Sequence, residues 1–288
     1  PFERFERTLV TLTLPFSPQA GATYHVVAQG VGGTMVTGAH TAATFVNDGR
    51  RLLAPDTQAV DLAVLGLRRM EPVGPRLVML EFGPAFSPPA GSRAANYHVA
   101  IDGEPVAVSR LGRVSRVDTY LPVGWPFAAI PMHEVYLELE RGFGEGAAVQ
   151  VTVDPAVTQA AREASIVFDS RATLSNSIKV NQVGYLADSP VKVAYLGRWM
   201  GSFPEGAAAA DAPSPALLLD AEPPFTICRE ADGEPAFEGQ SRLVHRSGEM
   251  NEGVYKHDHS GENVYLLDFT DFRTPGRYFI SVPGVGRS

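Results

Sequence analysis

Cysteine, clustered basic residues and long apolar runs are scarce in this 288-residue sequence. The one cysteine, Cys228, excludes an intrachain disulfide and any cysteine metal cluster, and it fits a reducing compartment as well as a secreted protein without disulfides. The net charge of −8 and the shortness of the basic pairs Arg50-Arg51 and Arg68-Arg69 argue against nucleic acid as a partner. No apolar stretch approaches the roughly 20 residues that cross a bilayer, so we expect no membrane partner.

Turn-forming residues, by contrast, are plentiful. The chain has 28 glycines and 23 prolines, with 44% hydrophobic and 19% charged residues, a composition typical of soluble globular domains with enough apolar material for packed cores. A length near 290 residues accommodates two or three domains. Short runs with period-2 alternation between turn signals predict an all-β protein built from β-sandwich modules.

A weak internal repeat predicts that two of these modules are of one kind. Val10–Val26 aligns with Val135–Val151 without a gap, and each copy reads as an alternating strand, a glycine-containing loop and a second short strand. Generic β-sandwich patterning is the alternative explanation. We place the modules at 1–70, 71–174 and 175–288. The first copy begins only about ten residues into the chain, whereas roughly 60 residues of strand-like sequence precede the second, so we expect the first module to lack amino-terminal strands. The amino end, PFERFERTLV, is not a signal peptide.

The structure of three further segments can be predicted from their sequence. Leu77–Phe82 is apolar on one face and mostly apolar on the other, which predicts a strand buried on both faces. Asp154–Ala164 reads as a linker or as a short helix capped by Asp154, because Pro155 suits the first helical position. The stretch Gly201–Pro224 is rich in Ala, Pro and Gly and has no period, which predicts a long surface insertion.

The last third of the sequence reads as another β-module. Alternating residues that begin at Ile178 and again at Val191 predict two strands. Asp232-Gly233 lies between two strand-like runs in the manner of a hairpin. A Pro275-Gly276 turn precedes Tyr278, at the place where sandwich domains often have a tyrosine whose hydroxyl returns to the backbone.

Two motifs stand at opposite ends of this module. They are IKVNQVGYLADSPVKVAYL, which begins at Ile178, and SGENVYLLDFTDFRTPGRYFISVPGVGRS, which begins at Ser260. With them, residues 177–288 resemble the immunoglobulin-like domain that precedes the catalytic domain in many family 9 glycoside hydrolases, chiefly bacterial endoglucanases and other cellulases. The resemblance implies a non-catalytic domain that stabilises and orients an adjacent (α/α) barrel, in which the active-site acid and base lie. The predicted fold is then all-β with tandem immunoglobulin-like β-sandwich modules.

The resemblance also sets the expected partners and location. In the family the sequence continues beyond the position of Ser288 with a last strand and then the barrel, so we expect the last strand to be missing here and the catalytic barrel of the same polypeptide to be the partner. A secreted or cell-surface enzyme that acts on polysaccharide is implied, without a cofactor. A surface-array or adhesion protein made of sandwich modules is the alternative.

No catalytic site is predicted within the chain itself. Glycoside hydrolysis needs two carboxyl groups about 5 to 10 Å apart, and Glu134, Glu138 and Glu140 lie near one another in the sequence. Glu138 and Glu140 alternate with Leu137 and Leu139, however, which is typical of a solvated strand face. The paired-aspartate motif that family 9 barrels use as their base is absent from the sequence.

Carbohydrate binding and metal binding give two weaker candidate sites. Trp125 and Trp199 lie in loop-like settings, where an exposed indole can stack on a sugar ring, although isolated tryptophans more often serve packing. His257, Asp258 and His259 could supply ligands to a metal, since alternate residues of a strand share a face. A polar loop that precedes a strand is the alternative for these three residues.

Overall fold

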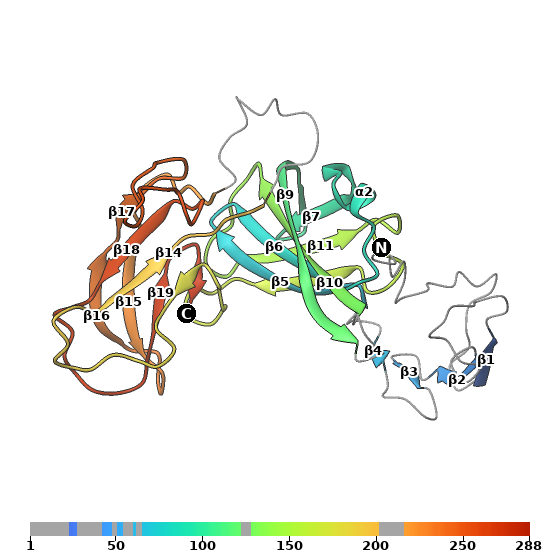
Figure 1. Ribbon diagram of the computed structural model, residues 1–288, viewed down its shortest axis with the longest axis horizontal. Coiled ribbons are helices and arrows are strands. Elements are labelled where there is room, and N and C mark those ends of the chain that lie inside the picture. The colour runs from blue at the N-terminus through green and yellow to red at the C-terminus, as the bar shows by residue number, and fades with distance from the viewer. Residues whose placement is uncertain are drawn as a thin grey trace.

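The structure, a computed structural model, describes residues 23–27, 42–47, 51–53, 60–61, 65–121, 128–201 and 216–288. Within these ranges the chain forms five four-stranded sheets and two short helical turns (Figure 1). The all-β prediction is confirmed. No helix in this part of the chain has the length and apolar character that crossing a bilayer requires. Trp125, residues 10–22 of the first repeat copy and residues 202–215 of the predicted insertion lie outside the described residues.

The amino-terminal sheet has the order β1-β2-β3-β4, so strands adjacent in the chain are also adjacent in the sheet. Its strands are β1 (Thr23–Val27), β2 (Ala42–Asn47), β3 (Arg51–Leu53) and β4 (Val60–Asp61). All three pairings are antiparallel.

Two antiparallel sheets with the orders β5-β6-β10-β9 and β12-β11-β7-β8 form what we call the central sandwich. Its elements are β5 (Leu67–Gly74), β6 (Leu77–Phe82), α2 (Pro88–Gly91), η2 (Ala94–Asn96), β7 (Tyr97–Ile101), β8 (Glu104–Val106), β9 (Val108–Leu121), β10 (Ala128–Leu139), β11 (Ala148–Val153) and β12 (Glu163–Val167). Alternate side chains of both sheets point between them, as the period of a strand requires. Val78, Val135 and Val151 are almost completely buried members of this core.

Two further antiparallel sheets, β13-β14-β18-β17 and β16-β15-β19-β20, form the C-terminal sandwich. Its strands are β13 (Ile178–Lys179), β14 (Val193–Leu196), β15 (Pro224–Arg229), β16 (Pro235–Gln240), β17 (Arg242–His245), β18 (Val264–Asp268), β19 (Tyr278–Val282) and β20 (Gly286–Arg287). Ala194, Leu196 and Leu267 are completely buried between its sheets.

Strand β6 of the β5-β6-β10-β9 sheet is buried on both faces. Leu80 and Phe82 of β6 belong to the core of the central sandwich, whereas Leu77 and Met79 of the same strand belong to the core of the C-terminal sandwich. The prediction that Leu77–Phe82 is buried on both faces is confirmed. The two sandwiches (Figure 1) therefore meet across an apolar surface as well as through polar contacts.

Two turns predicted from the sequence are confirmed. β15 and β16 pair as an antiparallel hairpin around Asp232-Gly233, where Gly233 has a φ of +73° that favours glycine. The hydroxyl of Tyr278 donates to the carbonyl oxygen of Pro275 at 3.4 Å, a long hydrogen bond back to the preceding turn.

The helix considered for Asp154–Ala164 does not form. The Asp154 carboxylate accepts a hydrogen bond from the N–H of Ala156 at 2.7 Å, and the Asp154 carbonyl accepts one from the N–H of Val157 at 2.9 Å. Asp154 thus closes a turn. The chain then pairs with β11 from Glu163 onward, because a ladder satisfies backbone groups that so short a helix would leave unpaired at its ends.

The predicted surface insertion is partly buried. Leu217, within Gly201–Pro224, has only 3% of its surface exposed. Its Cδ1 would lie 3.0 Å from a Cβ atom at Gly74, so this side chain packs against β5 of the central sandwich. Ala216 is buried as well, at 1% exposed. The sequence did not reveal these contacts, since a few adjacent buried residues produce no period.

Candidate functional site

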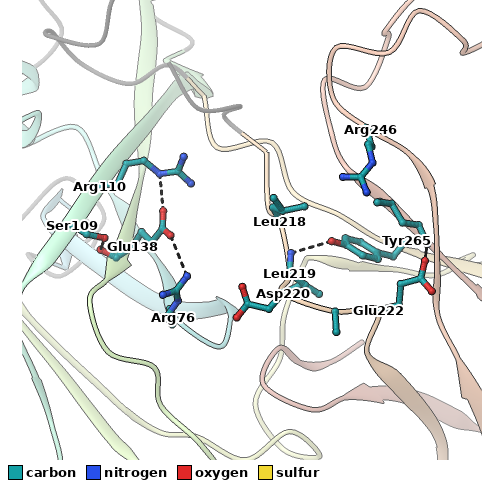
Figure 2. Close-up of a pocket in the computed structure, with 12 residues that line it drawn as sticks. Arg76, Ser109, Arg110, Glu138, Leu218, Leu219, Asp220, Glu222, Arg246 and Tyr265 are labelled. Carbon is teal, nitrogen blue, oxygen red and sulfur yellow. Dashed lines mark hydrogen bonds and ion pairs between the residues drawn. The ribbon is translucent and has the colours of Figure 1, made fainter. Parts of the chain in front are cut away.

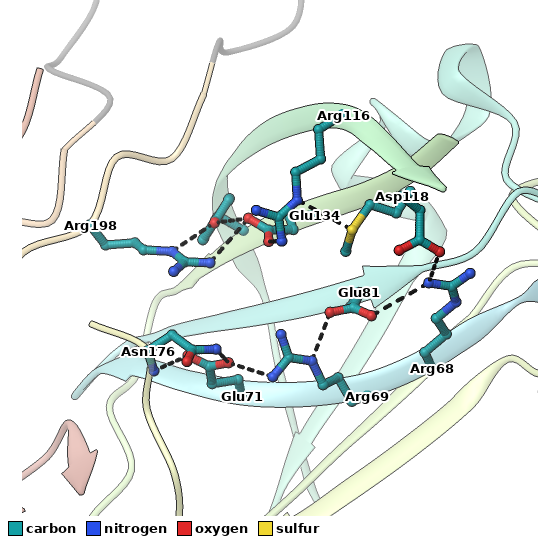
Figure 3. A network of polar contacts seen from close by, with 11 residues as sticks. Arg68, Arg69, Glu71, Glu81, Arg116, Asp118, Glu134, Asn176 and Arg198 are labelled. Atoms are coloured by element: carbon teal, nitrogen blue, oxygen red, sulfur yellow. Dashed lines mark hydrogen bonds and ion pairs between the residues drawn. The ribbon is translucent and has the colours of Figure 1, made fainter. Parts of the chain in front are cut away.

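A polar network joins the two sandwiches (Figure 3). Arg198 follows β14, and its Nη2 donates to Glu134 Oε2 on β10 at 3.0 Å, while its Nε donates to the Tyr136 hydroxyl at 2.8 Å. The Tyr136 hydroxyl in turn donates to the same Glu134 oxygen at 2.5 Å. Arg116 of β9 donates to Glu134 Oε1 at 2.8 Å. Glu134 therefore has a cationic partner from each sandwich.

The members of this network differ in exposure. The side chains of Glu134 and Arg198 are 6% and 15% exposed, whereas that of Arg116 is 58% exposed. Burial opposes the charge of Arg198, but the Tyr136 hydroxyl and the Glu134 carboxylate outweigh it and hold the pKa of Arg198 above its ordinary value. Burial also raises the pKa of Tyr136. Its hydroxyl consequently keeps the proton that it donates to Glu134.

The linker that enters the C-terminal sandwich is held on β5 by a second set of contacts (Figure 3). The backbone N–H and the Nδ2 of Asn176 donate to Glu71 Oε1 and Oε2 at 2.5 and 2.8 Å. Ser175 Oγ donates to the Pro72 carbonyl at 2.8 Å. Burial raises the pKa of Glu71, although the hydrogen bonds from Asn176 and the nearby guanidinium groups act in the opposite direction.

Close backbone approach at the junction requires glycine at two positions. A Cβ atom at Gly112 of β9 would lie 2.6 Å from the carbonyl oxygen of Met200, and one at Gly201 would lie 2.1 Å from that of Arg113. Gly201 also has a φ of +75°, a conformation that other residues adopt with strain. β9 therefore contacts the backbone of residues 200–201 directly.

A groove of about 820 Å³ also opens between the two sandwiches (Figure 2). One wall comes from β9 and β10 and the other from the segment Leu218–Glu222 with β17 and β18. Glu138 is held there by Arg110 at 2.6 Å and by Arg76 at 3.9 Å. Within the second wall, the Tyr265 hydroxyl accepts a hydrogen bond from the backbone N–H of Leu219 at 3.0 Å. Arg76, Arg110 and Glu138 thus pair with one another on the first wall.

The three acids considered for glycoside hydrolysis have different surroundings. Glu134 is buried and pairs with Arg198 across the junction. Glu138 is only partly exposed because Arg110 covers it, whereas Glu140 is exposed, as the prediction of a solvated strand face requires. Glu134 thus pairs with an arginine across the junction, whereas Glu138 pairs with arginines of its own sandwich.

Of the two candidate tryptophans, Trp199 lies in the described part of the chain. The backbone of Trp199 pairs with that of Ala216 in an isolated antiparallel bridge. Its ring lies over Gly261, with Cδ1 3.4 Å from the position of a Cβ at that glycine. The residue is 44% exposed, so one part of the indole packs on the Gly261 turn and the other part meets solvent.

The three residues predicted to bind a metal are not brought together. The rings of His257 and His259 contact each other edge to face, with their centroids 5.5 Å apart. Asp258 instead lies against His245, its Oδ1 being 3.2 Å from His245 Nε2. The segment is not a regular strand, because Glu252 and His257 form an isolated bridge and Lys256 has a φ of +56°. Alternation along the chain therefore does not place these side chains on one face.

Sequence reasoning missed the residues that the structure does bring together. Arg198, Glu134 and Tyr136 meet across more than 60 positions of the chain. Their one local signal is the alternation of Glu134 and Tyr136, which puts both on the same face of β10. His245 and Glu252, the partners of Asp258, have no motif spacing that would have identified them.

Comparison with known proteins gives one match to a family and three to solved structures. Residues 173–287 match the family model of the cellulase N-terminal ig-like domain. A metagenome-derived glycoside hydrolase family 9 endoglucanase is 32% identical over 38% of this chain and 16% of its own, with a TM-score of 0.26. The pullulanase of Bacillus acidopullulyticus is 10% identical over 77% of this chain and 34% of its own, with a TM-score of 0.19.

The third structure, pullulanase type I from Bacillus subtilis str. 168 complexed with maltose, is 8% identical over 75% of this chain and 23% of its own, with a TM-score of 0.18. No curated protein matches the chain. The part of the endoglucanase that the chain matches is 16% of the length of that enzyme. The resemblance predicted from the sequence is confirmed for residues 173–287, which match the cellulase N-terminal ig-like domain.

Proposed function

We propose that this chain is a non-catalytic, amino-terminal region of a family 9 glycoside hydrolase of the endoglucanase type. The observation that carries the proposal is the match of residues 173–287 to the cellulase N-terminal ig-like domain. The role of this region is to stabilise and orient a catalytic (α/α) barrel of the same polypeptide. The enzyme is secreted or held at the cell surface, where its polysaccharide substrate is found.

The junction between the sandwiches supports a role in orientation. Leu77 and Met79 of the central sandwich share a core with Leu196 of the C-terminal one, and Arg198 binds Glu134 across the junction. Closely packed interiors resist small displacements. A barrel docked on the C-terminal sandwich would therefore keep a fixed orientation relative to the central sandwich.

An apolar loop offers a contact surface for the barrel. Between β13 and β14, Val183, Leu186 and Val191 are 97%, 75% and 62% exposed. Grouped exposed apolar side chains are characteristic of interaction surfaces. Val193 pairs with Asp268 at the end of β18, so this loop lies at the opposite end of the sheet from the loop that joins β17 to β18.

The first test uses the parent reading frame. We expect it to encode, downstream, a segment with paired aspartates and a catalytic glutamate. That segment, purified separately, should melt at a higher temperature as this chain is added in excess, because a partner that binds the native state stabilises it by mass action. The 288-residue chain alone should release no reducing sugar from carboxymethyl cellulose. A reading frame without such a segment, or an unchanged melting temperature at high excess, would contradict the proposal.

A matched pair of variants tests the contact surface. Val183→Ser should weaken the stabilisation of the barrel, because it removes an apolar side chain from the loop between β13 and β14. Val254→Ser is the control, since Val254 is 91% exposed and lies in the loop at the other end of the sheet. Equal effects of the two substitutions would place the contact elsewhere.

Carbohydrate binding is a second candidate, supported by the half-exposed indole of Trp199. An exposed aromatic face held against a backbone turn can stack on a sugar ring. Retention of the chain on insoluble cellulose that disappears in Trp199→Ala would favour this function. The same measurement on Trp125→Ala tests the other candidate tryptophan. The supporting role alone predicts no retention of the unmodified chain.

A further inference from the structure

Three potential metal ligands converge beside the loop that joins β17 to β18. His245 ends β17 and is 5% exposed. Its Nε2 lies 3.2 Å from Asp258 Oδ1 and 3.8 Å from Glu252 Oε1. The carboxylate side chains are 17% and 22% exposed, and all three ligand atoms lie within 4.8 Å of one another. Around a tetrahedral cation with bonds of about 2.0 to 2.2 Å, ligand atoms are about 3.3 to 3.6 Å apart, which is close to the two separations measured from His245 Nε2.

The other side of the imidazole sets its tautomer. His245 Nδ1 lies 2.5 Å from Asn251 Oδ1. The Nδ2 of Asn251 donates to Glu249 Oε2 at 3.0 Å, so the amide oxygen faces the ring and Nδ1 carries the proton. In a neutral ring, Nε2 then directs its lone pair at two carboxylate oxygens. Three acceptor atoms repel one another at this distance unless a cation lies between them.

Backbone hydrogen bonds hold both carboxylates in place. Glu252 Oε2 accepts from the N–H groups of His259 and Ser260 at 2.6 and 2.8 Å, and its Oε1 accepts from Ser260 Oγ at 2.8 Å. Asp258 Oδ1 accepts from the N–H of Gly261 at 2.8 Å. Each oxygen that faces Nε2 therefore has one protein donor and keeps a lone pair. Such outer hydrogen bonds orient the ligands of metal sites.

We propose that His245 Nε2, Glu252 Oε1 and Asp258 Oδ1 bind one divalent transition-metal ion, such as Zn²⁺ or Mn²⁺. One imidazole with two carboxylates suits these ions better than Ca²⁺, which prefers six to eight oxygen ligands. The ion ties the loop to the end of β17. It also fixes the Gly261 turn on which Trp199 packs, because Gly261 is bound to the ligand Asp258.

The test uses the whole 288-residue chain without an affinity tag, treated with EDTA and dialysed. Titration calorimetry with ZnCl₂ and with MnCl₂ should give one saturable site per chain, and the melting temperature should rise with metal concentration. Glu252→Gln and Asp258→Asn, which keep the size of each side chain, should weaken binding at least tenfold. These two ligands are partly exposed, so their variants should fold even where a substitution of buried His245 does not.

Matched controls come from the adjacent histidines. His257→Gln and His259→Gln should leave affinity and stoichiometry unchanged, since neither ring belongs to the cluster. The ¹⁵N resonance of His245 Nε2 should shift on addition of Zn²⁺. If neither ion binds saturably, the proposal is overturned, and a protonated His245 Nε2 is then the positive charge between the two carboxylates. Loss of binding in the control variants, but not in Glu252→Gln, would overturn it in favour of the adjacent histidines.

Discussion

The contact between Arg198 and Glu134 should contribute strongly to stability, and Arg198→Met tests this. The substitution keeps an apolar stem but removes the hydrogen bonds to Glu134 at 3.0 Å and to Tyr136 at 2.8 Å. Removing one partner of a buried ion pair costs about 3 to 5 kcal/mol, because the other charge stays buried without compensation. Glu134 keeps its contact with Arg116. We therefore expect a loss near the lower limit, about 3 kcal/mol.

Arg116→Met is a matched control, because it removes the same type of residue from the same carboxylate. Arg116 approaches Glu134 as closely, at 2.8 Å, but its side chain is 58% exposed against 15% for Arg198. Exposed ion pairs contribute about 0 to 1 kcal/mol, since solvent screens them. The two substitutions should therefore differ by about 2 kcal/mol or more.

The assay is urea unfolding of the whole chain, followed by circular dichroism and by the fluorescence of the tryptophans. Trp199 is next to Arg198 in the chain, so an earlier fluorescence transition in Arg198→Met would indicate that the junction opens first. Equal losses in Arg198→Met and Arg116→Met would refute the argument that burial decides the contribution. So would a loss below about 1 kcal/mol in Arg198→Met, the value of a surface pair.

Two further predictions concern the central sandwich. Gly112→Ala should destabilise the chain by about 1 to 3 kcal/mol in thermal unfolding, because its Cβ would meet the Met200 carbonyl at 2.6 Å, whereas Gly144→Ala, with nothing within 4 Å of its Cβ, should be nearly neutral. Burial, assisted by the charge of Arg113, lowers the pKa of His133 from 6.5 to about 4, so the unfolded chain takes up a proton before the folded chain does. Stability should fall by up to about 3 kcal/mol as the pH drops from 6.5 to 4, and urea unfolding of His133→Gln over this range should lack that part of the slope; identical slopes would contradict the assignment.

The alternation of side chains was the most informative feature of the sequence, but it does not say which face is buried. Leu77–Phe82 is apolar on one face and mostly apolar on the other, and every residue of it except Glu81 is buried. In the run that begins at Val191, by contrast, Val191 is 62% exposed and Lys192 is 2% exposed. The Lys192 ammonium donates to the carbonyls of Ala187 and Thr270 at 3.0 and 2.8 Å. Polarity alone favours the opposite orientation, so the backbone carbonyls around the ammonium decide it.

The candidate sites were less predictable than the strands. The sequence places His257, Asp258 and His259 together because they are adjacent, but Asp258 turns to His245, 13 positions away. Side chains that meet through a loop leave no fixed spacing in the sequence. The same holds for Arg198, which lies 64 positions from Glu134.

The sequence by itself determined the all-β class, the hairpin at Asp232-Gly233 and the resemblance of its last part to the cellulase N-terminal ig-like domain. These features follow from period-2 alternation, from glycine at positive φ and from a local motif, all of which act over a few residues. The tertiary structure alone decided that one sheet is shared between two cores, that Arg198 reaches Glu134 and that His245 meets Asp258. Those contacts depend on how distant strands pack, because burial and the low dielectric it brings arise only when the sheets are assembled.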